Sequence, residues 1–168
     1  MLVAAHSVVS NGTPWNVNTG YYSSKSLSVA PQEGNPTGVA FSSDGTKAYV
    51  LGSTNDTIYQ YTLSVAWDIS TGSYASKSLS VAGQDTIPRG LAFSSDGARA
   101  YITGEANDMI FQYDLATPWD ISTGSYASKS LYVGGQDGFP RGLTFSSDGV
   151  YVYVTGAVSD AIFQYNLT

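Results

Sequence analysis

The sequence Phe-Ser-Ser-Asp-Gly occupies residues 41–45 and returns at 93–97 and at 145–149. Each copy begins 52 residues after the one before, from 41 to 93 and from 93 to 145. A fixed period of this length is typical of a chain that repeats one supersecondary unit. We therefore expect one repeat domain rather than several unrelated ones. The predicted divisions are a segment outside the repeats at 1–14 and repeats at 15–66, 67–118 and 119–168.

Within each repeat, four short segments have the character of strands. In the middle copy these are 90–93, 100–104, 109–115 and 129–133. Asp96-Gly97 separates the first two segments, and this pair favours the positive φ of a tight hairpin. The third segment alternates between apolar and polar residues, and the fourth mixes small polar with apolar residues, which predicts an outer strand. Four short antiparallel strands per repeat, without helical periodicity, are typical of a β-propeller blade.

The run Pro-Thr-Gly-Val-Ala-Phe-Ser-Ser-Asp-Gly at 36–45, followed by Tyr49-Val50, resembles the YVTN-type β-propeller repeat. The resemblance covers residues 15–168 and implies a propeller fold without implying an activity. The added Trp-Asp-Ile-Ser-Thr segment, at 67–71 and 119–123, departs from the common pattern. It is similar to blade repeats of marine bacterial and phage proteins of unassigned role.

The predicted fold class is all-β: a β-propeller with three four-stranded blades of about 52 residues in each chain. Propellers typically have four to eight blades, and three wedges would each have to span about 120°. Residues 25–29 read as an outer strand without a blade, and the last blade, with its third strand at 161–167, lacks an outer strand. We therefore expect oligomerisation to complete the ring, with six blades per dimer favoured. Nine blades per trimer and a fragment of a longer propeller are the alternatives.

Composition excludes several classes of function. The net charge is −6 with only 7 Lys and Arg residues, so no basic stripe is available to bind nucleic acid. No run approaches the ~20 apolar residues that span a bilayer, and the first residues lack the basic start of a signal peptide. The absence of cysteine excludes disulfides and thiolate metal sites. Because only 12% of residues are charged, the surface is polar and weakly charged, which favours an extracellular or virion-associated protein.

Catalytic residues are scarce in the sequence. The only histidine, His6, lies outside the repeats, so a Ser-His-Asp triad or a histidine metal site would have to be built around it. Glycosidases need two carboxylates beside the substrate, and the innermost strands contribute none. We therefore predict no enzyme activity, no metal and no cofactor. The hairpin aspartates, which we expect to bond the backbone of their own turns, are Asp44, Asp96 and Asp148.

Two sets of loops are expected on one face of the propeller: those that enter the innermost strands and those between the second and third strands. Their polar side chains form a candidate binding rim able to hold a sugar, a carboxylate or a protein loop. The structural alternative, which the sequence favours, is that each arginine bridges two blades through Asp85, Asp137 or a carbonyl. The candidate residues of the rim are Asp85, Arg89, Asn107, Asp108, Asp137, Arg141 and Asp160.

Trp15, Trp67 and Trp119 recur at one position of the repeat. Their rings are candidates for stacking on sugars. The alternative, which we favour, is that each tryptophan fills the gap between neighbouring blades.

The function predicted from these features is a non-enzymatic, lectin-like binding module that recognises a glycan or a surface protein through its loop face. Its expected partner is also a further copy of itself, with a dimer favoured and a trimer possible. We expect neither nucleic-acid binding nor membrane insertion. The alternatives are a self-assembling virion or cell-surface scaffold without a small ligand and, as the least favoured, a lactonase- or glycosidase-like enzyme.

Overall fold

The computed structural model describes residues 17–167, and within them the chain forms three antiparallel sheets. The first sheet contains β1 (Pro36–Phe41), β2 (Lys47–Gly52), β3 (Thr57–Leu63) and β4 (Gly72–Ser80). The second contains β5 (Pro88–Phe93), β6 (Arg99–Gly104), β7 (Met109–Leu115) and β8 (Gly124–Tyr132). The third contains β9 (Pro140–Phe145), β10 (Tyr151–Gly156) and β11 (Ala161–Asn166). Single turns of 3-10 helix occur at η1 (Val17–Thr19), η2 (Ile69–Thr71) and η3 (Ile121–Thr123).

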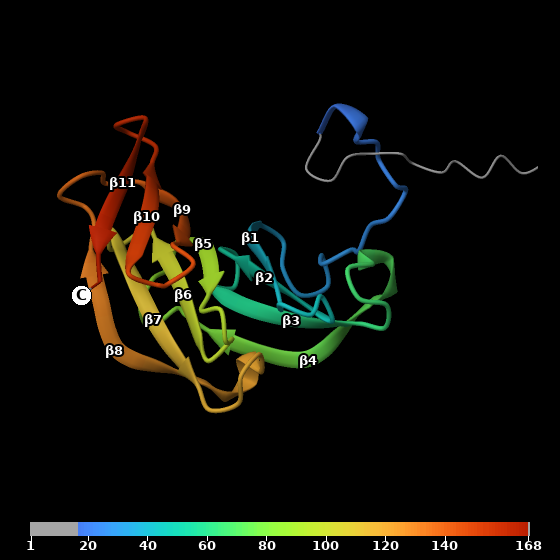
Figure 1. The fold of residues 1–168 in the computed structure, drawn as a ribbon. Helices are drawn as coiled ribbons and strands as arrows, with labels where there is room; N and C mark the ends of the chain where they lie inside the picture. Colours follow the sequence, from blue (N-terminus) through green and yellow to red (C-terminus); the bar gives the residue numbers. More distant parts are fainter. Residues whose placement is uncertain (1–16, 168) are drawn as a thin grey trace, which may run out of the picture.

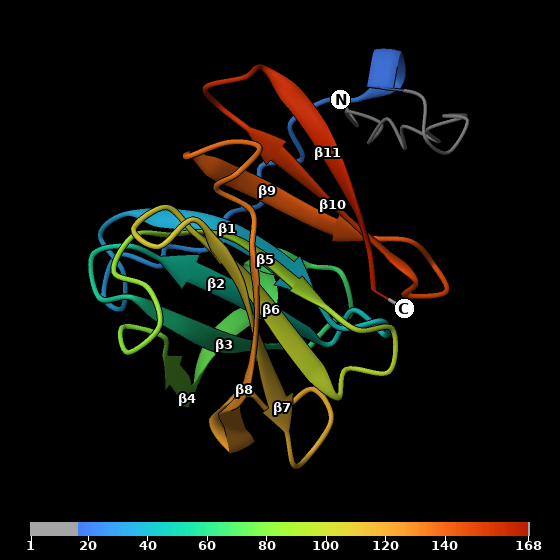
Figure 2. The ribbon, with the colours of Figure 1, turned by 90° about the vertical axis from the view of Figure 1, so that its left-hand side faces the viewer.

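The three sheets stand side by side along an open arc (Figures 1 and 2). Strands β1, β5 and β9 lie next to one another on the inside of the arc, and β4 and β8 form the outer edges of their sheets. The predicted strand order of a blade is therefore correct for the first two sheets. The third sheet has three strands, and among residues 17–167 no fourth strand pairs with β11, so the last blade lacks an outer strand, as predicted.

The repeated Ser-Asp-Gly sequence forms the hairpin between the first two strands of each sheet. Gly45 has a φ of 69°, which a glycine adopts without steric cost. Asp44 accepts hydrogen bonds from the Thr46 amide at 3.0 Å and the Ser42 hydroxyl at 2.6 Å. The aspartate thus bonds its own turn, as predicted. The same arrangement recurs at Gly97 and Gly149.

Apolar side chains fill the space between neighbouring sheets. Between the first two sheets, Tyr49 and Ile58 pack with Leu91 and Ile102, and all four are buried. Each such side chain contributes about 1.5–3 kcal/mol through burial, so this packing holds the arc together. The second interface is built in the same way by Ile110, Leu131, Leu143, Val152 and Val154.

Residues 25–29, predicted to be an outer strand, form no ladder with another described strand. The segment nevertheless packs against the first sheet through Leu27 and Val29. Lys25 also forms an ion pair with Asp68 at 2.7 Å. The same pair occurs one repeat later, where Lys77 of β4 pairs with Asp120. Residues 25–29 therefore contact the first sheet much as β4 contacts the second.

Candidate functional site

A hollow lies where the three innermost strands begin, on the face of the arc that carries the loops leading into them. It lies beside the first residues of β1, β5 and β9 and is lined by Thr37, Gly38, Arg89, Arg141 and Gly142, among others. A proline begins each of the three strands. We call this hollow the axial mouth.

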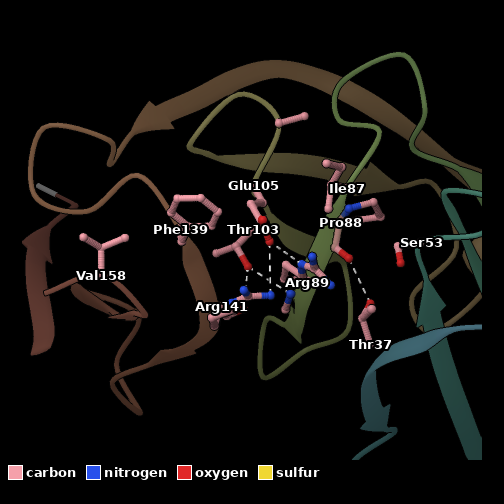
Figure 3. A network of polar contacts seen from close by, with 12 residues as sticks. Thr37, Ser53, Ile87, Pro88, Arg89, Thr103, Glu105, Phe139, Arg141 and Val158 are labelled. Carbon is pink, nitrogen blue, oxygen red and sulfur yellow. Dashed lines mark hydrogen bonds and ion pairs between the residues drawn. The ribbon is translucent and has the colours of Figure 1, made fainter. Parts of the chain in front are cut away.

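Two arginines and one glutamate form the charged centre of the axial mouth (Figure 3). The Arg89 Nε atom lies 2.6 Å from Glu105 Oε2, and an Arg141 terminal nitrogen lies 3.1 Å from the same oxygen. Arg89 comes from the second sheet and Arg141 from the third, so Glu105 joins two sheets. Among the described residues, Glu105 is the only carboxylate within ion-pair distance of either guanidinium group. The Arg141 side chain is 43% exposed, so its guanidinium charge is accessible from solvent.

Threonine hydroxyls fix the backbone around these arginines. Thr37 donates to the Pro88 carbonyl at 2.9 Å, from the first sheet to the second. Thr103 donates to the Arg141 carbonyl at 2.8 Å and accepts from the Gly90 amide at 2.9 Å. A Cβ atom on Gly90 would lie 2.5 Å from that carbonyl oxygen, so only glycine permits this close approach. The arginine backbones are therefore held by bonds between sheets.

Asp85 and Asp137, predicted for the rim, are buried behind it. Asp85 accepts from the amides of Ile87 at 2.8 Å and Asn107 at 2.9 Å, which ties two loops together. Asp137 does the same in the third sheet. Burial alone would raise the pKa of Asp137, but the Ser159 and Phe139 amides outweigh it and hold that pKa below its usual value. The arginines pair with Glu105 rather than with these aspartates. An arginine that bridges two sheets was predicted, and Arg141 does so, but its partner is Glu105 and not Asp85 or Asp137.

The remaining rim candidates occupy the loops between the second and third strands. Asn107 donates through its side-chain amide to the Gln84 carbonyl at 2.6 Å. Asp108 has a φ of 53°, and its buried Oδ1 atom has no hydrogen-bond partner. Burial, together with the charges of Asp85 and Asp137, raises the pKa of Asp108. Asp160 occupies the same loop position in the third sheet and is exposed.

Trp67 and Trp119 lie away from the axial mouth. Trp119 packs on Phe93, with ring centroids 5.3 Å apart, and its ring also approaches Tyr49 of the first sheet. This is the filling of a gap between sheets that we favoured over sugar stacking. Trp67 packs in the same way on Phe41 but is largely exposed. Trp15 lies outside the described residues.

Sequence reasoning missed Glu105 as a functional residue. It stands where the other repeats have Ser53 and Ala157, so it breaks the repeat directly after a strand. A charged residue at a position that is otherwise small and neutral was the available signal.

Among residues 17–167, no group of three or more metal-binding side chains lies together. No helix in the same range is long and apolar enough to cross a membrane.

No family model and no curated protein sequence matches the chain. Several solved structures do match it. A putative 6-phosphogluconolactonase from Bacteroides fragilis has a TM-score of 0.60 at 16% identity, over 78% of this chain and 34% of its own. The periplasmic gluconolactonase PpgL of Pseudomonas aeruginosa has a TM-score of 0.58 at 18% identity, over 78% and 35%. The β-propeller domain of Myceliophteria thermophila Cps50 (Swd1) has a TM-score of 0.54 at 15% identity, over 79% and 38%.

These similarities establish a β-propeller-like fold. At 15–18% identity, these similarities are evidence for the fold alone. The chain spans about a third of the length of each of these structures. The three sheets of the arc therefore correspond to part of a propeller.

Proposed function

We propose that this chain is a binding module that holds an anionic glycan, one with carboxylate-bearing sugars, in its axial mouth. The observation that carries the proposal is the half-exposed side chain of Arg141, whose guanidinium group shares a single carboxylate with Arg89. Guanidinium groups bind carboxylates through two parallel hydrogen bonds, and such charge-assisted bonds are among the strongest in proteins.

The surroundings of the arginines suit a sugar. Asn35 and Thr37 line the same hollow as the arginines, and their side chains can bond sugar hydroxyls. Leu91 and Leu143 supply apolar surface beside them. A concave site with apolar walls and a few placed polar groups is the usual form of a small-ligand site.

The type of propeller and its number of blades are also proposed here. We take the three sheets to be blades of a YVTN-type propeller, and further blades would enclose the axial mouth. Propellers have about four to eight blades, and a ring built from two copies of this chain would have six.

A glycan array read at high protein concentration tests the proposal, with uronic-acid and sialic-acid glycans beside neutral counterparts. We expect acidic glycans to be retained. The variant Arg141→Ala should weaken their binding about 10- to 100-fold, which corresponds to the loss of one charge-assisted contact. Arg99→Ala is the matched control, because Arg99 lies at the opposite end of β6 from Glu105 and pairs only distantly with Asp114, at 3.8 Å. Equal silence toward acidic and neutral glycans would refute the proposal.

A lactonase is the second candidate, favoured by the names of two of the similar structures. The same arginine pair would then hold the phosphate of a phosphorylated sugar lactone. Hydrolysis of 6-phosphogluconolactone, followed by NMR against the uncatalysed rate, decides this candidate. Turnover that Arg141→Ala abolishes would replace the binding module with an enzyme. If neither binding nor turnover is found, a purely structural scaffold becomes the better description.

A further inference from the structure

One packing arrangement occurs three times in the chain and is filled twice. We call it the tryptophan seat: the hairpin glycine of a sheet, Gly45, Gly97 or Gly149, with the surface around it. A Cβ atom on Gly45 would lie 2.3 Å from the Trp67 ring, and one on Gly97 would lie 2.2 Å from the Trp119 ring. Around Gly149, no atom of residues 17–167 lies within 4 Å of the same point.

The seat filled by Trp119 shows what the arrangement requires. The Trp119 amide donates to the Gly97 carbonyl at 3.0 Å, and its carbonyl accepts from the Tyr49 hydroxyl of the first sheet at 2.7 Å. Two residues further along, Ile121 is fully buried, and its amide donates to the Gln60 side chain at 3.0 Å. The segment that begins at Trp119 thus joins its own hairpin to the neighbouring sheet.

The seat at Gly149 has every fixed part of this arrangement. Tyr101 and Phe145 lie with their ring centroids 4.5 Å apart, as Tyr49 and Phe93 do. Gln112 stands at the position of Gln60. These residues, with Gly149, line an open cavity of about 380 Å³. No described residue occupies the place that Trp119 and Ile121 take in the filled seat.

The two ends of the arc expose apolar residues whose repeat equivalents are buried. On β11, Ile162 is 71% exposed, whereas Ile110 is 5% and Ile58 is 0% exposed. At the other end, Val39 on β1 is 64% exposed, whereas Leu91 is 8% exposed. Each exposed residue faces the position where the next sheet would stand. The face at Ile162 and the face at Val39 are therefore expected to pack against each other as neighbouring sheets within the chain do.

We propose that residues 15–29 of a second copy of this chain fill the seat at Gly149. In the repeat, Trp15-Asn16-Val17 aligns with Trp119-Asp120-Ile121, and Val17 is exposed. Trp15 would cover Gly149, and Val17 would take the buried place of Ile121 below Gln112.

The segment 25–29 is already positioned to add a strand. Leu27 and Val29 pack on the first sheet of their own chain, as Leu79 of β4 packs on the core that the first two sheets share. No described strand pairs with its backbone, so this edge can pair with β11 of the other copy. Ile58 pairs with Leu79, and Ile110 pairs with Leu131, so the repeat places Ile162 opposite Leu27 of the partner chain.

The docking is head-to-tail, and two copies close a ring of six sheets. Such a contact uses two different surfaces on each chain, so it closes only if the rotation per copy completes a circle. One contact of the filled seats is altered: Asn16 stands where Asp68 and Asp120 form ion pairs with lysines. Lys129, which makes no ion pair among the described residues, would therefore meet a side-chain amide.

The molecular mass in solution, measured by light scattering and by sedimentation, tests the docking. We expect the mass of two chains for the natural sequence and of one chain for Trp15→Ala and for Ile162→Ser. Both variants should keep the natural circular dichroism spectrum, because Ile162 is exposed and the buried core of residues 17–167 does not include Trp15. Tyr132→Ser is the matched control, since it removes an exposed apolar residue of β8 and gives the residue found at the same position of β4, Ser80. A mass of one or of three chains for the natural sequence would overturn the two-copy ring.

The strand register gives a second, independent test. The repeat places Ala161 opposite Ser28 of the other copy, because Met109 pairs with Tyr132 and Thr57 with Ser80. Opposed residues in antiparallel strands have Cα atoms about 4.5–5.5 Å apart, which suits a disulfide. Ser28→Cys with Ala161→Cys should give a covalent dimer on mild oxidation, since the chain has no other cysteine.

The shifted pair Ser26→Cys with Ala161→Cys controls for chance collisions, because its two positions would be out of register. It should remain unlinked under the same conditions. Equal cross-linking of both pairs, or a disulfide that forms only within one chain, would overturn the proposed docking.

Discussion

Asp44 accepts hydrogen bonds from the Ser42 hydroxyl and from both the amide and the hydroxyl of Thr46. These bonds stabilise the ionised carboxylate, so the Ser42 hydroxyl and the Thr46 amide together lower the pKa of Asp44 to about 2. The hydroxyls of Ser94 and Ser146 lower the pKa of Asp96 and Asp148 in the same way. Acid should therefore weaken all three hairpins.

The sign of the pH dependence follows from these pKa values. An unfolded aspartate titrates near pH 3.9, and the folded hairpin titrates lower, so the stabilisation is present above about pH 4 and is lost as the pH falls towards 2. We expect the urea midpoint to decrease over that range. Asp44→Asn should show a smaller decrease, because it removes one of the carboxylates that must be protonated. A midpoint equally sensitive to acid in Asp44→Asn and in the natural sequence would contradict this account.

At the residue scale, what could be predicted depended on how local the interaction is. The bond from Asp44 to its own turn spans two residues and followed from the Ser-x-Asp-Gly sequence. The pairing of Glu105 with Arg141 spans two sheets, and no local pattern encodes it. Asp85 was predicted for the rim because its loop was placed correctly, but its burial depends on how two loops pack.

At the scale of elements, the connection between the third and fourth strands locks onto the hairpin of the same sheet. Gly97 combines a φ of 70° with the Trp119 ring at the position of a Cβ atom. Gly97→Ala should therefore cost about 1–2 kcal/mol for the left-handed backbone and more for displacing the indole. Urea unfolding measures the loss. Gly83→Ala is the control, because no atom of the described residues lies within 4 Å of its Cβ position, and its stability should change by less than about 0.5 kcal/mol. Equal effects of the two substitutions would exclude the proposed role of the contact.

The strands themselves were predictable where turn chemistry and alternation agreed. Strands β5, β6 and β7 lie within two residues of the segments expected from sequence. Strand β8 begins at Gly124, five residues before the predicted start, because Ser125 and Tyr126 pair with β7 beyond a bulge that no sequence pattern marks. Residues 25–29 have the sequence of an outer strand, but a strand also needs a neighbour to pair with. The sequence pattern shows that a segment can form a strand. Whether it pairs into a ladder depends on whether another strand lies beside it.

At the scale of the whole molecule, the proposed ring would bring the axial mouths of two chains together around one axis. Each chain supplies two arginines and one glutamate to the axial mouth. A ring of two copies would therefore place four guanidinium groups and two carboxylates around one opening. These guanidinium groups would gather at one opening of a chain whose net charge is −6. Variants that break the ring, such as Ile162→Ser, allow ligand binding to be measured on the open arc, so that the two proposals can fail separately.

Docking also predicts that stability depends on protein concentration. A partner that binds only the folded chain stabilises it by mass action, and a 100-fold excess over the dissociation constant contributes about 2.7 kcal/mol. For a chain of this size, each kcal/mol shifts the melting temperature by about 2–4 °C. We expect the melting temperature of the natural sequence to rise by several degrees between about 1 and 100 μM, as measured by circular dichroism. Trp15→Ala should melt at the same temperature throughout, because its seat at Gly149 stays open at every concentration. A melting temperature of the natural sequence that does not change with concentration would mean that the exposed faces at Val39 and Ile162 find no partner in a second copy.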